Sequence, residues 1–316
     1  MTSVLRVELS TASNQPNITT KIMTTAIKRN NNVVVRETTR EFYTRPELMT
    51  MSVAKAKKTL GISYLGSVAI SHKLALSLEK GVATYGIYLA PADMSGRNVC
   101  PKCEHCKQFC LAGSGHNKID VLSGENRINR ARIKRTLLYF YNRPLFVKIM
   151  LHEIETGKRS AERKGVDFSS RINCVSDQSP LNFRDENGVN ILKLLPNVQF
   201  YDYTKVISRI NVAKRYDNYD LTFSFDGYNW EECETALKNG VRVAVVFSKR
   251  LPKKFHGYDV IDGDAYDFRY LDPHNVIVGL KYKSVYNDFK TINGVRTFIE
   301  PNTPFVVRTD NEFVEM

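Results

Sequence analysis

The sequence predicts an α/β fold: a partial or complete TIM-type (β/α) barrel of about seven parallel strands with an N-terminal extension. Short runs rich in β-branched and aromatic residues alternate with helix-length segments, which indicates parallel strands joined by helices. Polar residues follow nearly every run, and the strand ends of a barrel converge on one mouth. The 316 residues suit this barrel or an open doubly wound sheet, and the recurring polar strand ends favour the barrel.

Residues 1–80 are expected to form an N-terminal extension packed on the main domain. They hold an asparagine run, "KRNNNVVVRETT", followed by the helix-like segment "RPELMTMSVAKAKKTL". The main domain is predicted over residues 81–290, with a C-terminal tail over 291–316.

The strands of the main domain begin with "VATYGIYLAP" at residues 82–91, which leads into a cysteine-rich loop. Two helices are expected after that loop, separated at residues 142–144, where a proline interrupts the helical pattern. From residue 170 onward we predict six further strands, in the runs "RINCVSD", "NVQFYDYTK", "LTFSFDG", "VRVAVVF", "DVIDGD" and "NVIVGLKYK".

The charge of the chain is concentrated in its first half. Residues 1–165 hold 27 Lys and Arg against 12 Asp and Glu, a net +15, whereas the remainder holds 19 against 21, a net −2. Such a basic half favours a nucleic-acid or nucleotide partner. No apolar run is long enough to span a bilayer and the N-terminus lacks a secretory pattern. We therefore expect a soluble, cytoplasmic protein with reduced cysteines and no membrane partner.

The segment "CPKCEHCKQFC" places Cys100, Cys103, Cys106 and Cys110 within eleven positions. Thiolates this close in sequence can surround one metal centre, and all four lie in one stretch rather than in two separated pairs. This spacing favours an iron–sulfur cluster, of the 4Fe–4S type, over zinc, which stays the alternative. A lone run need not place all four cysteines on one centre, so three ligands and an open metal position is a second arrangement.

The position of these cysteines after the first predicted strand would bring a metal to the mouth of the barrel. Gly113, Ser114 and Gly115 follow the loop and can present backbone N–H groups to an anion, although a simple loop exit explains them as well. Lys281 ends the last predicted strand and is a further candidate for cofactor binding.

Carboxylates and cationic side chains at the strand ends are the candidates for catalysis. Carboxylates can hold Mg²⁺ or transfer protons, and lysine or arginine can bind phosphate, although turn formation and internal ion pairs explain such residues equally well. The candidates are Asp177, Asp202, Lys205, Asp226, Asp262, Asp264, Asp267 and Arg269.

The first helix after the cysteine loop carries a line of basic residues. Arg127, Arg130 and Lys134 share one face, with Arg132 and Arg135 adjacent. Such a line can follow a phosphate backbone, and a solvated helix face is the alternative.

Several features share their order along the chain with one known family. They are the cysteines at positions 100, 106 and 110 and the motifs "RINCVSDQ", "FYDYTK", "LTFSFDG", "VIDGDAYDFRYLDP" and "VIVGLKYK". Taken together, they resemble the bacteriophage gene product 88 family. The resemblance covers about residues 80–290. It implies a phage or mobile-element origin and a role inside an infected bacterium, and it makes Cys103 additional to the regular cysteines.

The predicted barrel with cysteines after strand one also resembles radical S-adenosylmethionine enzymes. Their usual spacing is C-x3-C-x2-C, whereas residue 113 here is glycine, so S-adenosylmethionine is the less favoured cofactor.

We therefore expect a phage iron–sulfur protein, an enzyme with its cluster at the barrel mouth that acts on a nucleotide or nucleic acid. One alternative is a non-catalytic nucleic-acid-binding protein in which zinc stabilises the loop. Another is a factor that modulates a host protein. Common nucleophile, phosphate-loop and zinc-protease motifs are absent from the sequence.

Overall fold

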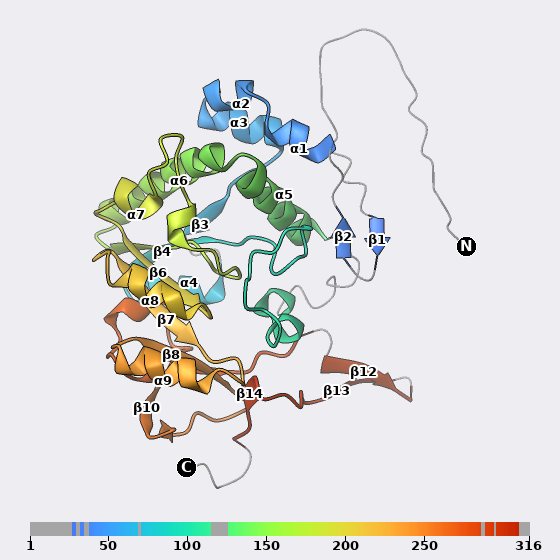
Figure 1. Ribbon diagram of the computed structural model, residues 1–316, viewed down its shortest axis with the longest axis vertical. Helices are drawn as coiled ribbons and strands as arrows, with labels where there is room; N and C mark the ends of the chain where they lie inside the picture. Colours follow the sequence, from blue (N-terminus) through green and yellow to red (C-terminus); the bar gives the residue numbers. More distant parts are fainter. Residues whose placement is uncertain are drawn as a thin grey trace.

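A ten-stranded mixed sheet forms the centre of the molecule (Figure 1). The computed structural model describes residues 27–29, 32–34, 38–68, 71–114, 126–285, 288–293 and 295–309. The strand order is β3-β4-β5-β6-β7-β8-β11-β10-β9, and β14 pairs with β8 beyond the end of β7. The path is open, because β3 and β9 end it without pairing to each other.

The predicted TIM-type barrel is therefore wrong. Each strand from β5 to β8 is parallel to its predecessor in the chain and lies beside it, as in a barrel. After β8 the order reverses, because β11 lies between β8 and β10. The connections also change: in the described residues, β8 through β11 are joined by turns and a short 3₁₀ helix rather than by α-helices. Strands that return toward their predecessors cannot continue around a barrel.

The strands of the main sheet share a parallel direction apart from β3 and β9. Their bounds are β3 Gly66–Val68, β4 Val82–Ile87, β5 Asp167–Arg171, β6 Gln199–Thr204, β7 Tyr219–Ser224, β8 Arg242–Phe247, β9 Lys254–Phe255, β10 Tyr258–Asp262, β11 Ile277–Lys281 and β14 Val306–Val307. Two separate hairpins are formed by β1 Ile27–Arg29 with β2 Asn32–Val34, and by β12 Phe289–Ile292 with β13 Val295–Phe298.

Helices precede and connect the first strands. They are α1 Thr38–Tyr43, α2 Glu47–Thr50, α3 Val53–Leu60, α4 His72–Glu79, α5 Arg127–Tyr141, α6 Arg143–Arg163, α7 Ile191–Leu194, α8 Ile210–Ala213 and α9 Trp230–Lys238. The predicted interruption at 142–144 is confirmed: Asn142 caps α6 by accepting from the Leu145 N–H at 3.2 Å, with Pro144 in the first turn.

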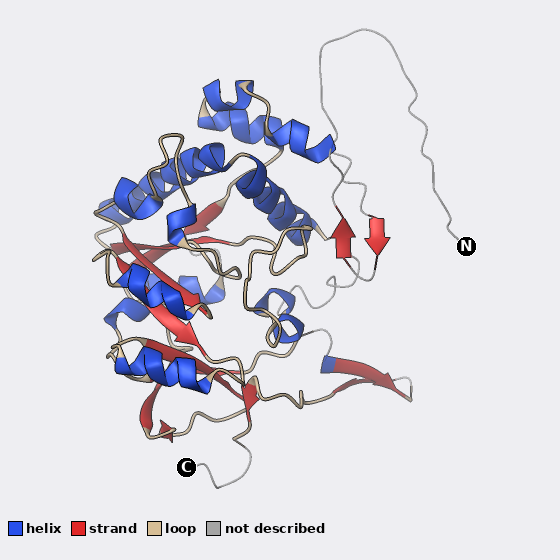
Figure 2. Ribbon diagram, viewed as in Figure 1, coloured by secondary structure: helices blue, strands red, loops and turns tan. Residues whose placement is uncertain are grey.

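One face of the sheet, here called the outer face, is covered by α5 to α9. Each step from β4 to β8 moves one position in the same direction, so right-handed crossovers place all the connecting helices on that face. Figure 2 shows α5 and α6 beside the β3–β4 end of the sheet and α9 beside β8. The main apolar core lies in this layer, where Phe200, Phe223 and Val245 pack with helix residues such as Phe146 and Leu237.

The opposite, inner face is covered by α4 and by residues 263–276, here called the inner crossover. The step from β10 back to β11 runs in the reverse direction along the sheet, so a right-handed crossover must lie on the inner face. Contacts confirm this placement: the Asp267 N–H donates to Ser77 Oγ of α4 at 3.0 Å, and Tyr201 of β6 donates to the Asp267 carboxylate at 2.8 Å. The inner face is therefore filled by buried polar groups.

Both expected flanking segments contribute strands to the main sheet. β3 lies within the expected extension and pairs with β4, while β14 lies within the expected tail and pairs with β8. Glu153 of α6 fixes the first of these regions, since its carboxylate accepts from the Leu65 and Gly66 N–H groups and from Tyr85 Oη at 2.7 Å. No described helix combines the length and apolarity that crossing a membrane would require.

Candidate functional site

The cysteine loop, residues 100–114, lies across the edge of the sheet where the parallel strands end. It begins beside the segment after β5, where the Asp177 N–H donates to Val99 O at 2.8 Å. Further along, the His105 ring lies 4.2 Å from the ring of Tyr228, which follows β7. The Phe109 ring stacks on Phe305 just before β14, at 5.9 Å. The loop therefore contacts segments that follow or precede several strands, at the edge of an open sheet rather than at the expected mouth of a barrel.

Two short 3₁₀ helices give the loop its shape, at Lys107–Phe109 and Leu111–Gly113. Backbone hydrogen bonds close successive turns on the cysteines themselves: Cys103 O accepts from Lys107 N, Cys106 O from Phe109 N, and Cys110 O from Gly113 N. Tight turns of this kind bring side chains three or four positions apart onto one side.

Cys100 is held by a strained neighbour. Ala92 adopts a left-handed backbone with φ of 48°, unusual for a residue with a Cβ, and its N–H donates to Cys100 Sγ at 3.4 Å. The thiol itself lies 3.7 Å from Val175 O. Burial raises the pKa of Cys100 to about 12, opposed by the Ala92 N–H and reinforced by Cys110 and Cys106.

Cys106 and Cys110 belong to the same group of thiols. Burial raises the pKa of Cys110, Cys106 raises it further, and the Ala112 N–H, Arg132 and Lys205 lower it. The Lys205 ammonium lies within electrostatic range of Cys106; burial opposes its charge, but Cys106 and Asp177 outweigh burial and raise the pKa of Lys205. Cys100, Cys106 and Cys110 are therefore within electrostatic range of one another, beside the end of β6.

Cys103 stands apart from these three. Burial and then Cys106 and Glu104 raise its pKa, and neither Cys100 nor Cys110 is among the largest influences on it. Among the residues that the structure describes, no three His, Cys, Asp or Glu side chains are arranged to hold a metal ion. The donor set of thiols, with backbone N–H groups directed at two of them, is chemically suited to an iron–sulfur cluster, since such hydrogen bonds tune cluster potentials.

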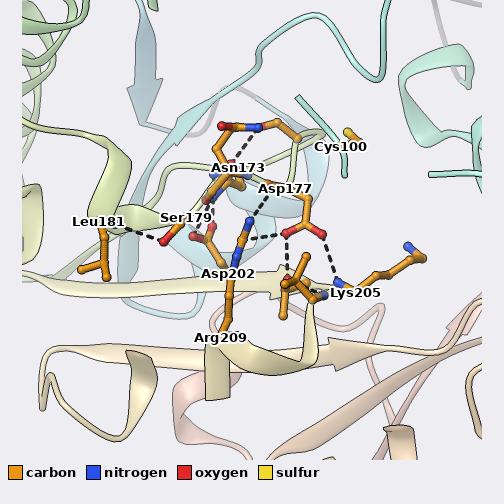
Figure 3. A network of polar contacts seen from close by, with 12 residues as sticks. Cys100, Asn173, Asp177, Ser179, Leu181, Asp202, Lys205 and Arg209 are labelled. Atoms are coloured by element: carbon orange, nitrogen blue, oxygen red, sulfur yellow. Dashed lines mark hydrogen bonds and ion pairs between the residues drawn. The ribbon is translucent and has the colours of Figure 1, made fainter. Parts of the chain in front are cut away.

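Asp177 connects the loop after β5 to β6, as Figure 3 shows. Its carboxylate accepts from Thr204 Oγ1 at 2.8 Å and from the Lys205 N–H at 3.0 Å, and Arg209 Nη1 lies 2.7 Å from it. Arg209 Nη2 also donates to the Asp177 carbonyl. These contacts fix the backbone from which the Lys205 side chain reaches Cys106.

Asp202 is buried beneath the same segment (Figure 3). It accepts from the Asn173 N–H at 3.1 Å and from Asn173 Nδ2 at 2.8 Å, and Asn173 in turn accepts from Ser176 and Gln178. Burial raises the pKa of Asp202 to about 7, although the Asn173 amide opposes the shift. The carboxyl group organises the loop rather than facing solvent.

The remaining predicted carboxylates do not form one cluster. Asp226 is in the turn after β7, where it accepts from the Tyr228 N–H. Asp262 and Asp264 lie at the end of β10, and Asp264 accepts from the Lys281 N–H at 2.8 Å. Asp267 and Arg269 are fully buried on the inner face. The chain reversal at the inner crossover separates these two groups.

Some of the residues predicted to bind an anion or a phosphate backbone instead form hydrogen bonds within the protein. The Gly113 and Ser114 N–H groups donate to Cys110 O and Leu111 O, and Gly115 lies outside the described residues. Arg127 and Arg130 are exposed on α5. The other two support neighbouring backbone: Lys134 donates to Gly61 O, and buried Arg135 donates to Tyr64 O and Tyr88 O.

Two further arginines at this edge were not among the predicted site residues. Arg132 of α5 is 6% exposed and donates to Ala112 O of the cysteine loop. Arg171 ends β5 and donates to Asp267. The sequence has no signal that marks them, because Arg132 is one of five basic residues in ten positions and Arg171 is the first residue of a predicted strand.

Comparison with known proteins gives one match. No curated protein and no solved structure matches the chain. The family model described as "Gene product 88" matches residues 48–294, which include β3 to β12 and the whole cysteine loop. This match extends the resemblance noted from the motifs toward the N-terminus by more than one helix, into α2 and α3. The chain belongs to the gene product 88 family of phage proteins.

Proposed function

We propose that this protein is an iron–sulfur protein whose cluster is bound by Cys100, Cys106 and Cys110. The observation that carries the proposal is that these three thiols act electrostatically on one another in the loop at the strand ends, with the Lys205 charge acting on Cys106. The Ala92 N–H donates to Cys100 Sγ, and the Ala112 N–H lowers the pKa of Cys110. Both features suit thiolates, because donors and a cation stabilise the negative charge that cluster ligation requires.

The placement of the residues supports an enzyme rather than a purely structural role. A cluster held by three cysteines supplies electron transfer and an iron position open to a substrate. Lys205 would compensate the charge of the thiolates, and Asp177 would hold the Lys205 backbone in place. The largest influences on the pKa of Cys103 include Cys106 but neither Cys100 nor Cys110. We therefore propose three cysteine ligands rather than four.

The test is anaerobic purification followed by iron and sulfide analysis and a visible spectrum. We expect iron and sulfide in comparable amounts and a broad brown absorption. Single Cys→Ser variants at 100, 106 and 110 should each lose most of the iron, whereas Cys103→Ser should keep it. Cys233→Ser is the matched control, because that thiol is buried in α9 away from the loop.

Two results would contradict the proposal. A colourless protein with stoichiometric zinc would replace it with the zinc alternative. Equal loss of iron in Cys103→Ser and Cys106→Ser would show four ligands and remove the argument for an open iron.

A further inference from the structure

We propose that a binding site for an anionic group, a carboxylate or a phosphate, lies beneath the cysteine loop between Arg132 and Arg171. Arg132 approaches from α5 through its contact with the loop at Ala112 O, and Arg171 approaches from the end of β5. Neither residue takes part in the proposed ligation of the cluster.

Both arginines leave the same edge of the guanidinium group free. Arg132 donates through Nη1 to Ala112 O at 3.3 Å, and Arg171 donates through Nη1 to Asp267 at 2.9 and 2.8 Å. Within the described part of the chain, neither Nε has a hydrogen-bond partner, although both are buried, and neither Nη2 makes a hydrogen bond. The Nε–Nη2 edge is one that can bind a carboxylate or phosphate through two parallel hydrogen bonds. A buried donor without a partner is costly, so two such edges point to a missing acceptor.

Both guanidinium groups act electrostatically on the same neighbours, Tyr88 and Cys174. The Arg132 Cζ lies 5.6 Å from the centre of the Tyr88 ring, and the Cys174 thiol lies 3.6 Å from Arg171 O. Arg171 acts electrostatically on both Tyr88 and Cys174, and its Cζ lies 4.5 Å from the Tyr203 ring centre. The Tyr203 hydroxyl is also buried without a partner among the described residues. It supplies a third donor beside Arg171.

The charges around this position are not balanced by protein carboxylates. In the described residues, Lys73 and Arg171 both pair with Asp267, and Arg132 forms no ion pair with a carboxylate. By contrast, the buried Arg269 and Arg242 each have a carboxylate partner of their own, Asp272 and Asp220. Because buried charges are normally paired, a bound anion is the expected complement.

The site would also lie beside the proposed cluster, since Arg132 acts on Cys110. That the bound anion belongs to the substrate rests on the proposed function, whereas anion binding itself does not. The substrate would then be a molecule with a carboxylate or phosphate group.

The test is calorimetric titration of the full chain with inorganic phosphate and, separately, with succinate, at constant ionic strength. We expect saturable binding of one of them, which identifies the anion class. Arg132→Gln and Tyr203→Phe should each weaken it, the first by about tenfold or more, because a charge-assisted bidentate contact is lost. Arg130→Gln is the matched control on the same helix, since Arg130 is exposed, and it should bind as the unaltered protein does.

Absence of saturable binding with both probes would overturn the inference, and so would unchanged affinity in a well-folded Tyr203→Phe variant. Iron content measured on the same samples keeps the two proposals separate. Iron without anion binding would refute only the site, and anion binding without iron would refute only the cluster.

Discussion

Arg171 donates through Nη1 to both carboxylate oxygens of Asp267, at 2.9 and 2.8 Å, and this pair joins the end of β5 to the inner crossover. Asp267 is fully buried and also accepts from Tyr201 and pairs with Lys73 at 3.4 Å. Asp267→Asn should therefore lower the free energy of unfolding by about 3–5 kcal/mol, because it leaves buried cations without their partner. Urea denaturation at pH 7 measures this. Asp259→Asn, at an exposed ion pair with Lys254, should change it by less than about 1 kcal/mol.

The same carboxylate predicts sensitivity to acid. Burial opposes its charge, but Arg171 and Lys73 outweigh burial and hold the pKa of Asp267 well below its usual range. A lowered folded pKa contributes stability that is complete above the unfolded value of about 3.9 and is lost as pH falls below it. Urea denaturation at several pH values between 5 and 2 should show that the free energy of unfolding falls as pH falls. The Asp267→Asn variant should show a smaller decrease over the same range. Identical slopes for the two proteins would contradict the assignment.

Asp202 should have the opposite effect. Burial raises its pKa to about 7, so between about pH 4 and 7 the folded protein holds a proton that the unfolded chain has released. The free energy of unfolding should consequently fall as pH rises through this range. Asp202→Asn should flatten the dependence by an amount on the order of 2–4 kcal/mol between pH 5 and 8. Asp217→Asn, at an exposed position on the loop before β7, should leave it unchanged.

Gly227 tests how the last strand supports the cysteine loop. Its φ is 99°, and a Cβ there would lie 2.5 Å from the Pro304 carbonyl carbon, next to Phe305 that stacks on Phe109. Gly227→Ala should destabilise the protein by more than Gly188→Ala does. Gly188 also has a positive φ, of 77°, but there is open space where its Cβ would lie. The second variant should cost about 1–2 kcal/mol from backbone strain alone. Equal losses in urea denaturation would mean that the contact with Pro304 is relieved without cost.

Lys205→Met tests the cation beside Cys106. If the cluster is present, removing this positive charge should make its reduction potential more negative, by a shift on the order of 60 mV, because net charge near a cluster sets its potential. A potentiometric titration followed by visible absorbance measures the shift. Lys283→Met, which removes a half-exposed lysine paired with Asp264, is the control. A shift of the same size in both variants would count against a specific contact with Cys106.

Local features were predictable from sequence where nearby residues determine them. The interruption before Pro144 and the position of the cysteines after the first parallel strand both follow from short stretches. β5 was displaced: it ends at Arg171, where the predicted run "RINCVSD" begins, because Asn173 and Ser176 hydrogen-bond within the following loop. In this segment side-chain hydrogen bonding overrode the β propensity of the sequence.

Features that depend on distant residues were not predictable. Whether the sheet closes depends on which strands β11 lies between, and these are β8 and β10. The apolar run at residues 277–281 would fit between any two buried strands, so the sequence does not identify its neighbours. Likewise, the spacing of four cysteines does not say which thiols group together. Residues outside the cysteine motif also act on these thiols, since the Ala92 N–H donates to Cys100 Sγ and Lys205 lies within electrostatic range of Cys106.

The insertion of β11 between β8 and β10 also constrains the order of assembly. When β10 leaves the ribosome, its place in the sheet is separated from β8 by a strand that has not yet been synthesised. At that stage β10 can pair only with β9, as a short hairpin of two residue pairs. The segment from β9 onward therefore cannot join the sheet strand by strand as it emerges. β10 and the buried Asp267 can take their places only once β11, which ends at Lys281, lies between β8 and β10, and the pairing of β14 with β8 follows when residue 307 is made.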